Sequence, residues 1–240
     1  MSASFQIVVP TIRQQLPGFA EALESIRQSF TLPTELVILD GSAGKPAALN
    51  AAVDTLLLES RHEFYVTLDD DVVPATGWQE VAVRAFRDVP DLGCVAPWYG
   101  DTPEMLELMG ASRIGQEERI GSTRLRTCLK GHHLLGGMLI FPAEVARHVG
   151  KLPDRPEKYL IWEDAWRGRR VLAQGKRLGF LMDAHVRLIE YTDPQEYLAE
   201  KRLEIESARR DQDRFLSATG IRDPWLIRFR RWAYKIRTRS

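Results

Sequence analysis

Short apolar runs alternate with segments of helical periodicity through the first hundred residues, and this alternation constrains the fold more than any other feature. The runs predict strands, and the segments between them predict helices. Strands are expected over 5–9, 36–39, 64–68 and 92–96, and helices over 17–30, 46–58 and 77–86. Such alternation is typical of an α/β domain with a mainly parallel sheet flanked by helices. We therefore expect a Rossmann-like layer.

The pattern changes after the fourth strand. Between Tyr99 and Lys130, several glycines and a proline interrupt the hydrophobic periodicity, so the sequence predicts a mobile, irregular loop. Beyond it we expect a strand over 134–141, a helix over 163–174, a strand over 178–182 and a charged helix over 193–216. The simplest division is a catalytic-type domain, 1–190, followed by a helical appendage, 191–240.

Composition limits the classes of function. The chain has 240 residues, 44% hydrophobic and 28% charged, which suits a globular domain with a substantial core. Its formal net charge of zero argues against nucleic acid as the general partner. Cys94 and Cys128 lie far apart in sequence, which disfavours a metal-thiolate site and a disulfide framework. With no signal peptide and no spanning apolar run, we expect a cytoplasmic protein.

Three consecutive aspartates, Asp69 to Asp71, follow the third expected strand. Burying like charges side by side costs several kcal/mol unless something neutralises them. The triplet is therefore either a solvated acidic turn or a binding site for a divalent cation. Asp40 follows the second strand in the same way and is either a turn former or a ligand-binding carboxylate. In α/β sheets, ligands bind beyond the carboxyl ends of the strands, where both would lie.

Further candidates lie downstream. Glu163 and Asp164 open an expected helix, where acidic residues serve as caps or as catalytic groups. His185 follows the last expected strand and is either a structural histidine or a metal ligand. Trp162 either stacks on a sugar ring or fills the core. His132 and His133 either touch substrate or lie on a surface loop, and we expect the surface loop.

Taken together, these segments resemble the inverting GT-A glycosyltransferases of family 2. The resemblance covers about residues 5–190, and it rests on these residues: Val8-Val9-Pro10-Thr11, Leu39-Asp40-Gly41-Ser42, Gly44-Lys45-Pro46-Ala47-Ala48-Leu49-Asn50, Asp69-Asp70-Asp71, Gly136-Gly137, Glu163-Asp164 and His185. It implies a GT-A fold with a nucleotide-sugar half, about 1–97, and an acceptor half, about 98–190. It also implies metal-dependent transfer of one sugar from a nucleotide donor, for which we expect a UDP-sugar, to a hydroxyl acceptor.

The resemblance also implies residue roles. The nucleotide sugar would be bound by Pro10, Thr11, Arg13, Asp40, Gly41, Lys45, Asn50, Asp69 and Asp70. Asp71, Asp69 and His185 would hold Mn²⁺ or Mg²⁺, and Gly136, Gly137 and Trp162 would lie by the acceptor. Asp164 would be the general base, with Glu163 beside it on the acceptor or a cation. In one departure from the family, Lys45 follows the Asp40 turn almost at once, where a helix and strand usually intervene.

The last nineteen residues form a basic amphipathic segment. Trp225, Phe229, Trp232 and Ile236 share one helical face, and seven basic residues less Asp223 give residues 222–240 a net charge of +6. Such a helix suits an anionic membrane surface, which predicts peripheral contact with the inner face of a membrane and a lipid-linked or surface glycan acceptor. Alternatively, the apolar face packs on its own domain or on a second subunit, which would make a homo-oligomer.

Three other functions remain open. The basic tail also suits a sugar transferase that acts on modified nucleic acid, for which binding would depend steeply on salt. A sugar-nucleotide nucleotidyltransferase needs a glycine-rich loop straight after the first strand, whereas this chain has Pro10-Thr11-Ile12-Arg13 there. A third alternative is a binding protein without catalytic turnover. The presence of both the aspartate triplet and the Glu163-Asp164 pair disfavours it, because such a protein would not need both.

Overall fold

The computed structural model describes residues 3–110, 113–129, 133–153, 163–191, 195 and 197–204. The chain divides into two compact units, Met1–Thr192 and Asp193–Ser240. In the second unit, residues 197–204 are helical. Trp162 and the basic tail, 222–240, lie outside the described residues, so the roles expected of them stay predictions.

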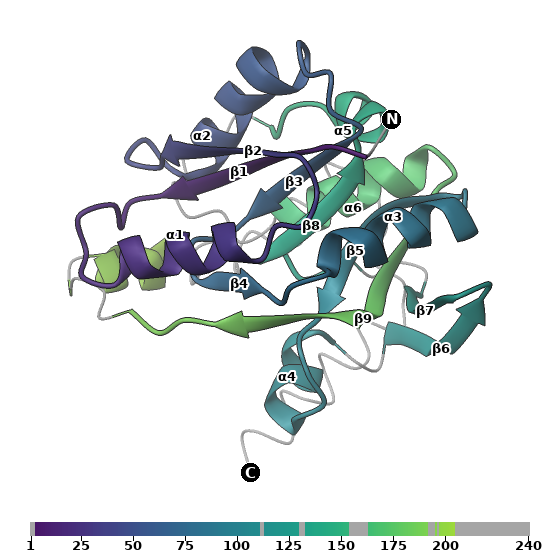
Figure 1. Cartoon of the computed structure of the whole chain (residues 1–240). Helices are drawn as coiled ribbons and strands as arrows, with labels where there is room; N and C mark the ends of the chain where they lie inside the picture. The colour runs from purple at the N-terminus through teal and green to yellow at the C-terminus, as the bar shows by residue number, and fades with distance from the viewer. Residues whose placement is uncertain are drawn as a thin grey trace. The chain divides into compact units, whose positions relative to one another are not determined.

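The first unit is built on one large sheet (Figure 1). Its strands are β1 (Phe5–Thr11), β2 (Thr34–Asp40), β3 (Phe64–Leu68), β4 (Val72–Pro74), β5 (Leu92–Trp98), β6 (Ile114–Ile120), β7 (Thr123–Cys128), β8 (Met138–Pro142) and β9 (Arg177–Leu188). Their order across the sheet is β2-β1-β3-β8-β5-β9-β7-β6, and β4 pairs with β9.

Most strands of the sheet point the same way. Strand β1 pairs in parallel with β2 and β3, and β5 pairs in parallel with β9. Strand β8 runs antiparallel between β3 and β5, and β7 runs antiparallel between β9 and β6. Strands β2, β1, β3, β5, β9 and β6 therefore share one direction, which β8, β7 and β4 oppose. The expected α/β class with a mainly parallel sheet is confirmed.

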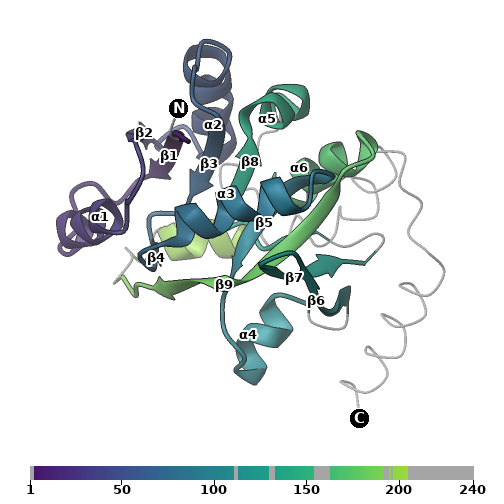
Figure 2. The same cartoon turned by 45° about the vertical axis from the view of Figure 1, so that its right-hand side comes forward.

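Helices cover both faces of this sheet (Figure 2). They are α1 (Phe19–Gln28), α2 (Lys45–Ala52), the π-helix η1 (Val53–Leu57), α3 (Trp78–Asp88), α4 (Pro103–Leu108), α5 (Ala143–Val149) and α6 (Glu163–Ala173). One hydrophobic cluster lies under α2, η1, α5 and α6, and the other lies under α1 and α3.

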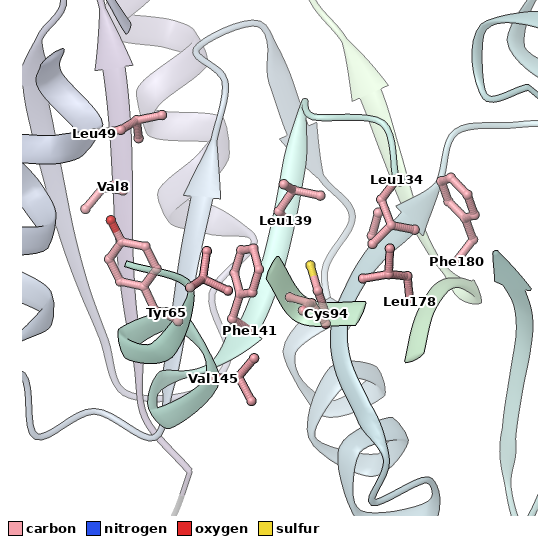
Figure 3. Packing of buried hydrophobic residues seen from close by; sticks show 14 of the residues in the cluster. Val8, Leu49, Tyr65, Cys94, Leu134, Leu139, Phe141, Val145, Leu178 and Phe180 are labelled. Carbon is pink, nitrogen blue, oxygen red and sulfur yellow. The ribbon is translucent and has the colours of Figure 1, made fainter. Parts of the chain in front are cut away.

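Strand β1 shows why a strand inside the sheet is mostly apolar. Val8 packs into the cluster of α2 and α5 (Figure 3), whereas Ile7 and Val9 pack into the cluster of α1 and α3. All three side chains are fully buried. A strand covered on both faces needs a continuous apolar run, and each such side chain contributes roughly 1.5–3 kcal/mol on burial.

The prediction of an irregular loop over residues 99–130 is wrong for most of that range. It holds helix α4 and the hairpin of β6 and β7, which the structure joins through a turn at Gly121. The Asp88 carboxylate accepts hydrogen bonds from Ser122 N–H, Ser122 Oγ and Thr123 Oγ1 and thereby fixes that turn. Charged side chains dominate β6, which lies at the sheet edge, so no apolar run marks it.

Two boundaries differ from expectation in the second half. The strand predicted over 134–141 begins only at Met138, because Gly136 and Gly137 form a turn in front of it. The strand predicted over 178–182 continues to Leu188, so His185 lies within β9 rather than beyond its end. Pairing with β4 extends β9 in this way. None of the helices among the described residues has both the length and the apolar character needed to cross a membrane.

Candidate active site

The carboxyl ends of β1, β2 and β3 bring polar residues to one edge of the sheet. Thr11, the last residue of β1, is directly opposite Asp40, the last residue of β2. Strand β3 lies on the other side of β1 and leads straight into Asp69. The predicted gathering of Thr11, Asp40 and the aspartate triplet at one edge therefore follows from the parallel pairing.

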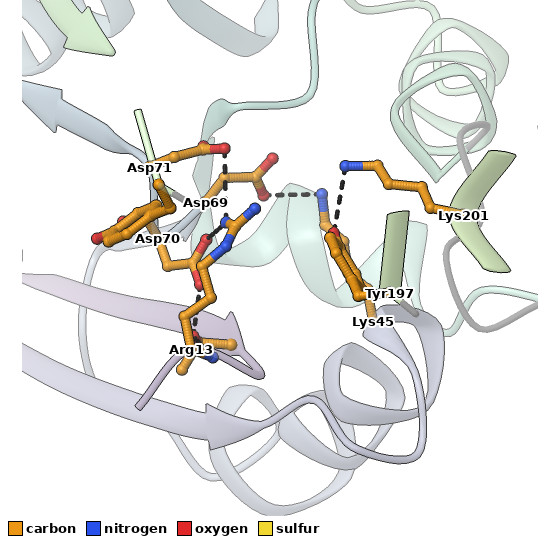
Figure 4. Close-up of polar contacts among 9 residues, drawn as sticks. Arg13, Lys45, Asp69, Asp70, Asp71, Tyr197 and Lys201 are labelled. Carbon is orange, nitrogen blue, oxygen red and sulfur yellow. Dashed lines mark hydrogen bonds and ion pairs between the residues drawn. The ribbon is translucent and has the colours of Figure 1, made fainter. Parts of the chain in front are cut away.

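Asp70 is the buried member of the triplet. Its carboxylate accepts hydrogen bonds from the Thr11 hydroxyl and, at 2.5 Å, from Arg13 Nη1 (Figure 4). Burial raises the pKa of Asp70, and the hydrogen bonds from Thr11 and Arg13 oppose that rise. Because both of its oxygens are occupied, Asp70 fixes the loop after β1 against the triplet.

Asp71 is the accessible member, with 40% of its side chain exposed. Its nearest cationic group is Arg13, whose Nη1 lies 3.6 Å from Asp71 Oδ2. The Arg13 guanidinium also lies over the Tyr191 ring, 4.9 Å from its centroid. The Tyr191 hydroxyl donates to the backbone oxygen of Asp70 at 3.1 Å. Arg13 and Tyr191 thus hold the triplet in place and leave Asp71 open to solvent and ligands.

Asp69 is paired with Lys45, the first residue of α2. Lys45 Nζ lies 2.7 Å from Asp69 Oδ1 and also contacts Glu163 Oε1 at the start of α6. Burial alone would lower the pKa of Lys45, but the two carboxylates raise it more, so Lys45 is a cation at neutral pH. Burial raises the pKa of Asp69 to about 6, against the opposing effect of Lys45. The ammonium therefore joins residues from β3, α2 and α6.

Asp164 lies beside this ion pair and is almost enclosed, with 13% of its side chain exposed. Burial, and then the neighbouring Glu163 charge, raise the pKa of Asp164 to about 8. Its Oδ1 accepts from the backbone N–H of Ala165, and its Oδ2 lies 3.7 Å from His133 Nε2. A carboxyl group with this pKa can take up and release a proton near neutral pH.

The glycine pair in front of β8 connects the two groups of carboxylates. The Gly137 carbonyl oxygen accepts from Asp69 N–H at 2.8 Å. A Cβ on Gly136 would lie 3.1 Å from the Asp164 Cβ, and a Cβ on Gly137 would lie 2.7 Å from the Tyr99 hydroxyl. A side chain at position 137 would therefore clash with Tyr99, and one at position 136 would press on Asp164.

We expect Gly136→Ala to lower activity by about three- to tenfold with little loss of thermal stability. The added methyl group would lie 3.1 Å from the Asp164 Cβ and would press on that side chain, and a full 1 Å misplacement of a reacting group can cost about a hundredfold in rate. Steady-state kinetics and thermal melting of the purified variant measure both effects. Wild-type kinetics in Gly136→Ala would show that this contact does not matter.

The residues at the end of β2 are arranged around a tight turn. Gly41 donates its N–H to the Thr11 carbonyl at 2.9 Å, and a Cβ there would lie 3.1 Å from the Thr11 backbone. The exposed Asp40 carboxylate accepts from Ser42 N–H and Oγ, which lower its pKa. Asn50 uses its amide to bind the backbone of Leu152 and so joins α2 to the segment after α5. Their contacts with a nucleotide stay predictions.

The carboxylates of the triplet suit a hard divalent cation, although the chain alone does not enclose one. Among the residues that the structure describes, no three His, Cys, Asp or Glu side chains form a group that could hold a metal ion, and the predicted set of Asp69, Asp71 and His185 is not assembled as one. The His185 side chain is exposed. Mg²⁺ is typically held by one or two carboxylates together with substrate phosphates rather than by a complete protein cage. Asp69 and Asp71 fit that arrangement.

Several residues at this edge were not predicted from the sequence. Tyr99 and Tyr191 contact the glycine pair and the triplet, and His133, expected on a surface loop, lies beside Asp164. Arg167, one turn into α6, is buried, and its Nη1 donates to the Thr67 hydroxyl at 3.1 Å. The position of Arg167 could have been inferred, because residues four apart on a helix share a face and Arg167 follows Glu163 by four. Nothing in the sequence around Tyr99 and Tyr191 indicates that they lie at this edge.

Comparison with solved structures agrees with the fold. The chain is similar to the mannosyltransferase PcManGT from Pyrobaculum calidifontis, solved with GDP-Man and Mn²⁺, at a TM-score of 0.53 and 19% identity over 81% of this chain and 59% of that one. It is also similar to GalNAc-T7, solved with UDP, GalNAc and Mn²⁺, at a TM-score of 0.52 and 12% identity over 81% of this chain and 45% of that one. Scans of protein-family models and of curated proteins find no match. At these identities the likeness establishes the GT-A-like fold.

Proposed function

We propose that this protein is a metal-dependent inverting glycosyltransferase of the family 2 type, moving one sugar from a nucleotide-diphosphate donor to a hydroxyl acceptor. One observation carries the proposal: the aspartate triplet, Lys45 and the Glu163-Asp164 pair meet at the carboxyl edge of β1 to β3. This edge is where α/β sheets bind ligands. Two neighbours in fold were solved with Mn²⁺ and a nucleotide or nucleotide sugar.

The donor would bind at the ends of β1, β2 and β3. Pro10, Thr11, Arg13, Asp40 and Gly41 would line the nucleotide pocket, and Asp70 would lie near the ribose. Asp71 and Asp69, with His185 as a further candidate, would hold Mn²⁺ or Mg²⁺, which would act as a Lewis acid and neutralise charge on the diphosphate. UDP is the expected nucleotide.

The acceptor would be activated by Asp164. The hydroxyl of the acceptor is a poor nucleophile and must lose a proton during attack, which calls for a positioned carboxylate base. Asp164, with its pKa raised to about 8, is suited to take that proton. One base suffices for a single displacement with inversion, and Glu163, which is paired with Lys45, is not required as a second catalytic carboxylate. Gly136 and Gly137 would lie by the acceptor, and the tail, 222–240, would favour a lipid-linked or surface glycan.

A thermal-shift screen of nucleotide sugars, with and without Mn²⁺, tests the proposal. A ligand that binds the native state raises its apparent stability, by about 2.7 kcal/mol at a hundredfold excess over Kd. We expect one nucleotide sugar to raise the melting temperature only when Mn²⁺ is present. The same sugar without its nucleotide should have no effect. A screen in which no nucleotide sugar shifts the melting temperature would contradict the proposal.

A further inference from the structure

Lys45 occupies an unusual position for a cation. It is the first residue of α2, where the helix dipole disfavours positive charge, and it follows Gly44, whose φ of 101° sets the entry into the helix. Helix stability therefore does not explain a lysine at this position. Its side chain is 23% exposed, and its ammonium is held by carboxylates from two other elements, Asp69 after β3 and Glu163 in α6.

The ammonium meets the same carboxylate that a metal ion would need. Asp69 belongs to the triplet, and its Oδ1 lies 2.7 Å from Lys45 Nζ. The other candidate carboxylate, on Asp71, has Arg13 at 3.6 Å. In the ligand-free chain, side-chain cations thus take part of the role that a divalent ion would have. An ion that binds Asp69 must displace Lys45 or share the carboxylate with a second positive charge.

We propose that Lys45 is an internal cation that competes with the metal ion for Asp69 and is released only when a nucleotide diphosphate arrives. The inference rests on the proposed function, and it concerns the order of binding at that site. The diphosphate offers anionic oxygens to both the metal ion and the ammonium, so binding of the donor relieves the competition. Metal ion and donor should therefore bind cooperatively, with weak metal binding in the absence of nucleotide.

Mn²⁺ binding to the free protein tests this inference without any turnover. The electron paramagnetic resonance signal of unbound Mn²⁺ reports the fraction bound in a titration of the full chain. We expect Lys45→Met to bind Mn²⁺ about tenfold more tightly than the wild type when no nucleotide is present. Lys45→Arg keeps the charge and should bind as weakly as the wild type. Addition of UDP should strengthen Mn²⁺ binding in the wild type more than in Lys45→Met.

Lys151→Met is a matched control for the loss of one positive charge. Lys151 pairs with Asp54 at 2.5 Å and is 52% exposed, so its removal changes the net charge without touching the triplet. If Lys151→Met gained as much Mn²⁺ affinity over the wild type as Lys45→Met does, the inference would be overturned. So would unchanged or weaker binding in Lys45→Met, or no binding in either protein. Lys45→Gln serves as a second variant if Lys45→Met does not fold.

The two proposals fail in different ways. If no nucleotide sugar binds, the proposed function fails, while tighter Mn²⁺ binding in Lys45→Met would still show the competition. If a nucleotide sugar binds with Mn²⁺ and Lys45→Met leaves Mn²⁺ affinity unchanged, only the inference about Lys45 fails.

Discussion

Replacement of Asp164 by asparagine is expected to lower the rate of sugar transfer by about 10²–10⁴-fold, the usual contribution of a general base. Asparagine keeps the shape of the side chain and can still accept the 2.6 Å hydrogen bond from Ala165 N–H. It cannot take a proton from the acceptor. Donor affinity should change little, because Asp164 lies at the start of α6, whereas the donor residues come from β1 to β3. Initial rates and donor titrations of the purified variant measure both quantities.

The pH dependence of the wild type should agree with this role. The pKa of Asp164 is raised to about 8, and only the ionised form acts as a base. The value of kcat/KM should therefore rise as the pH rises toward 8 and level off above it. Asp91→Asn, which alters a carboxylate paired with Arg177 away from the site, should keep both the rate and the profile. Near-wild-type turnover by Asp164→Asn would refute the assignment of the base.

Asp164→Asn should also change how stability depends on pH. The folded pKa of Asp164 lies above its unfolded value near 3.8, so the folded state binds more protons between these two values. The contribution of Asp164 to stability is present below pH 4 and is lost as the pH rises through about 8. Asparagine does not ionise. The melting temperature of the variant should therefore rise relative to that of the wild type as the pH increases.

The second large effect is expected for Asp71→Ala, which should weaken metal-dependent donor binding by about a hundredfold or more. Asp71 is the accessible carboxylate of the triplet, and a divalent ion at a diphosphate supplies several kcal/mol of charge stabilisation. Because the side chain is 40% exposed, its removal should have little effect on the fold. Isothermal titration with the nucleotide sugar and Mn²⁺ measures the change.

Asp54→Ala is the matched control for Asp71→Ala. Asp54 lies on the π-helix η1, is 49% exposed and pairs with Lys151, away from the triplet. The Asp54→Ala variant should bind the donor as the wild type does, with the same requirement for Mn²⁺. Donor affinity in Asp71→Ala that equals the affinity in Asp54→Ala would show that Asp71 does not serve the metal ion.

Much of the fold was predictable because its central strands are buried on both faces. The runs at β1, β3 and β5 are mostly apolar, with Gln6 inside β1 and Thr67 inside β3 as exceptions, and such runs identify buried strands from local sequence alone. Strand β6 carries charged residues at the edge of the sheet, so its sequence shows neither an apolar run nor a clear alternation. Strand β4 has only three residues and forms because β9 extends to meet it.

The candidate site was predictable where residues follow strands directly. Asp40 and Asp69 lie at strand ends, and parallel pairing brings such ends together. The partners of these residues were not predictable, because they depend on contacts between distant segments. Lys45 meets Asp69 and Glu163 only in the folded chain, and Tyr191 meets Asp70 across 121 residues. His133 was expected on the surface, and the packing of α6 brings it to Asp164.

Release of nucleoside diphosphate from the nucleotide sugar that gives the largest thermal shift tests the central claim most directly. With an acceptor extract or with water as acceptor, the wild type should release the diphosphate only in the presence of Mn²⁺ or Mg²⁺, and Asp164→Asn and Asp71→Ala should release almost none. No release from any nucleotide sugar by the wild type, or equal release by the wild type and both variants, would contradict the account.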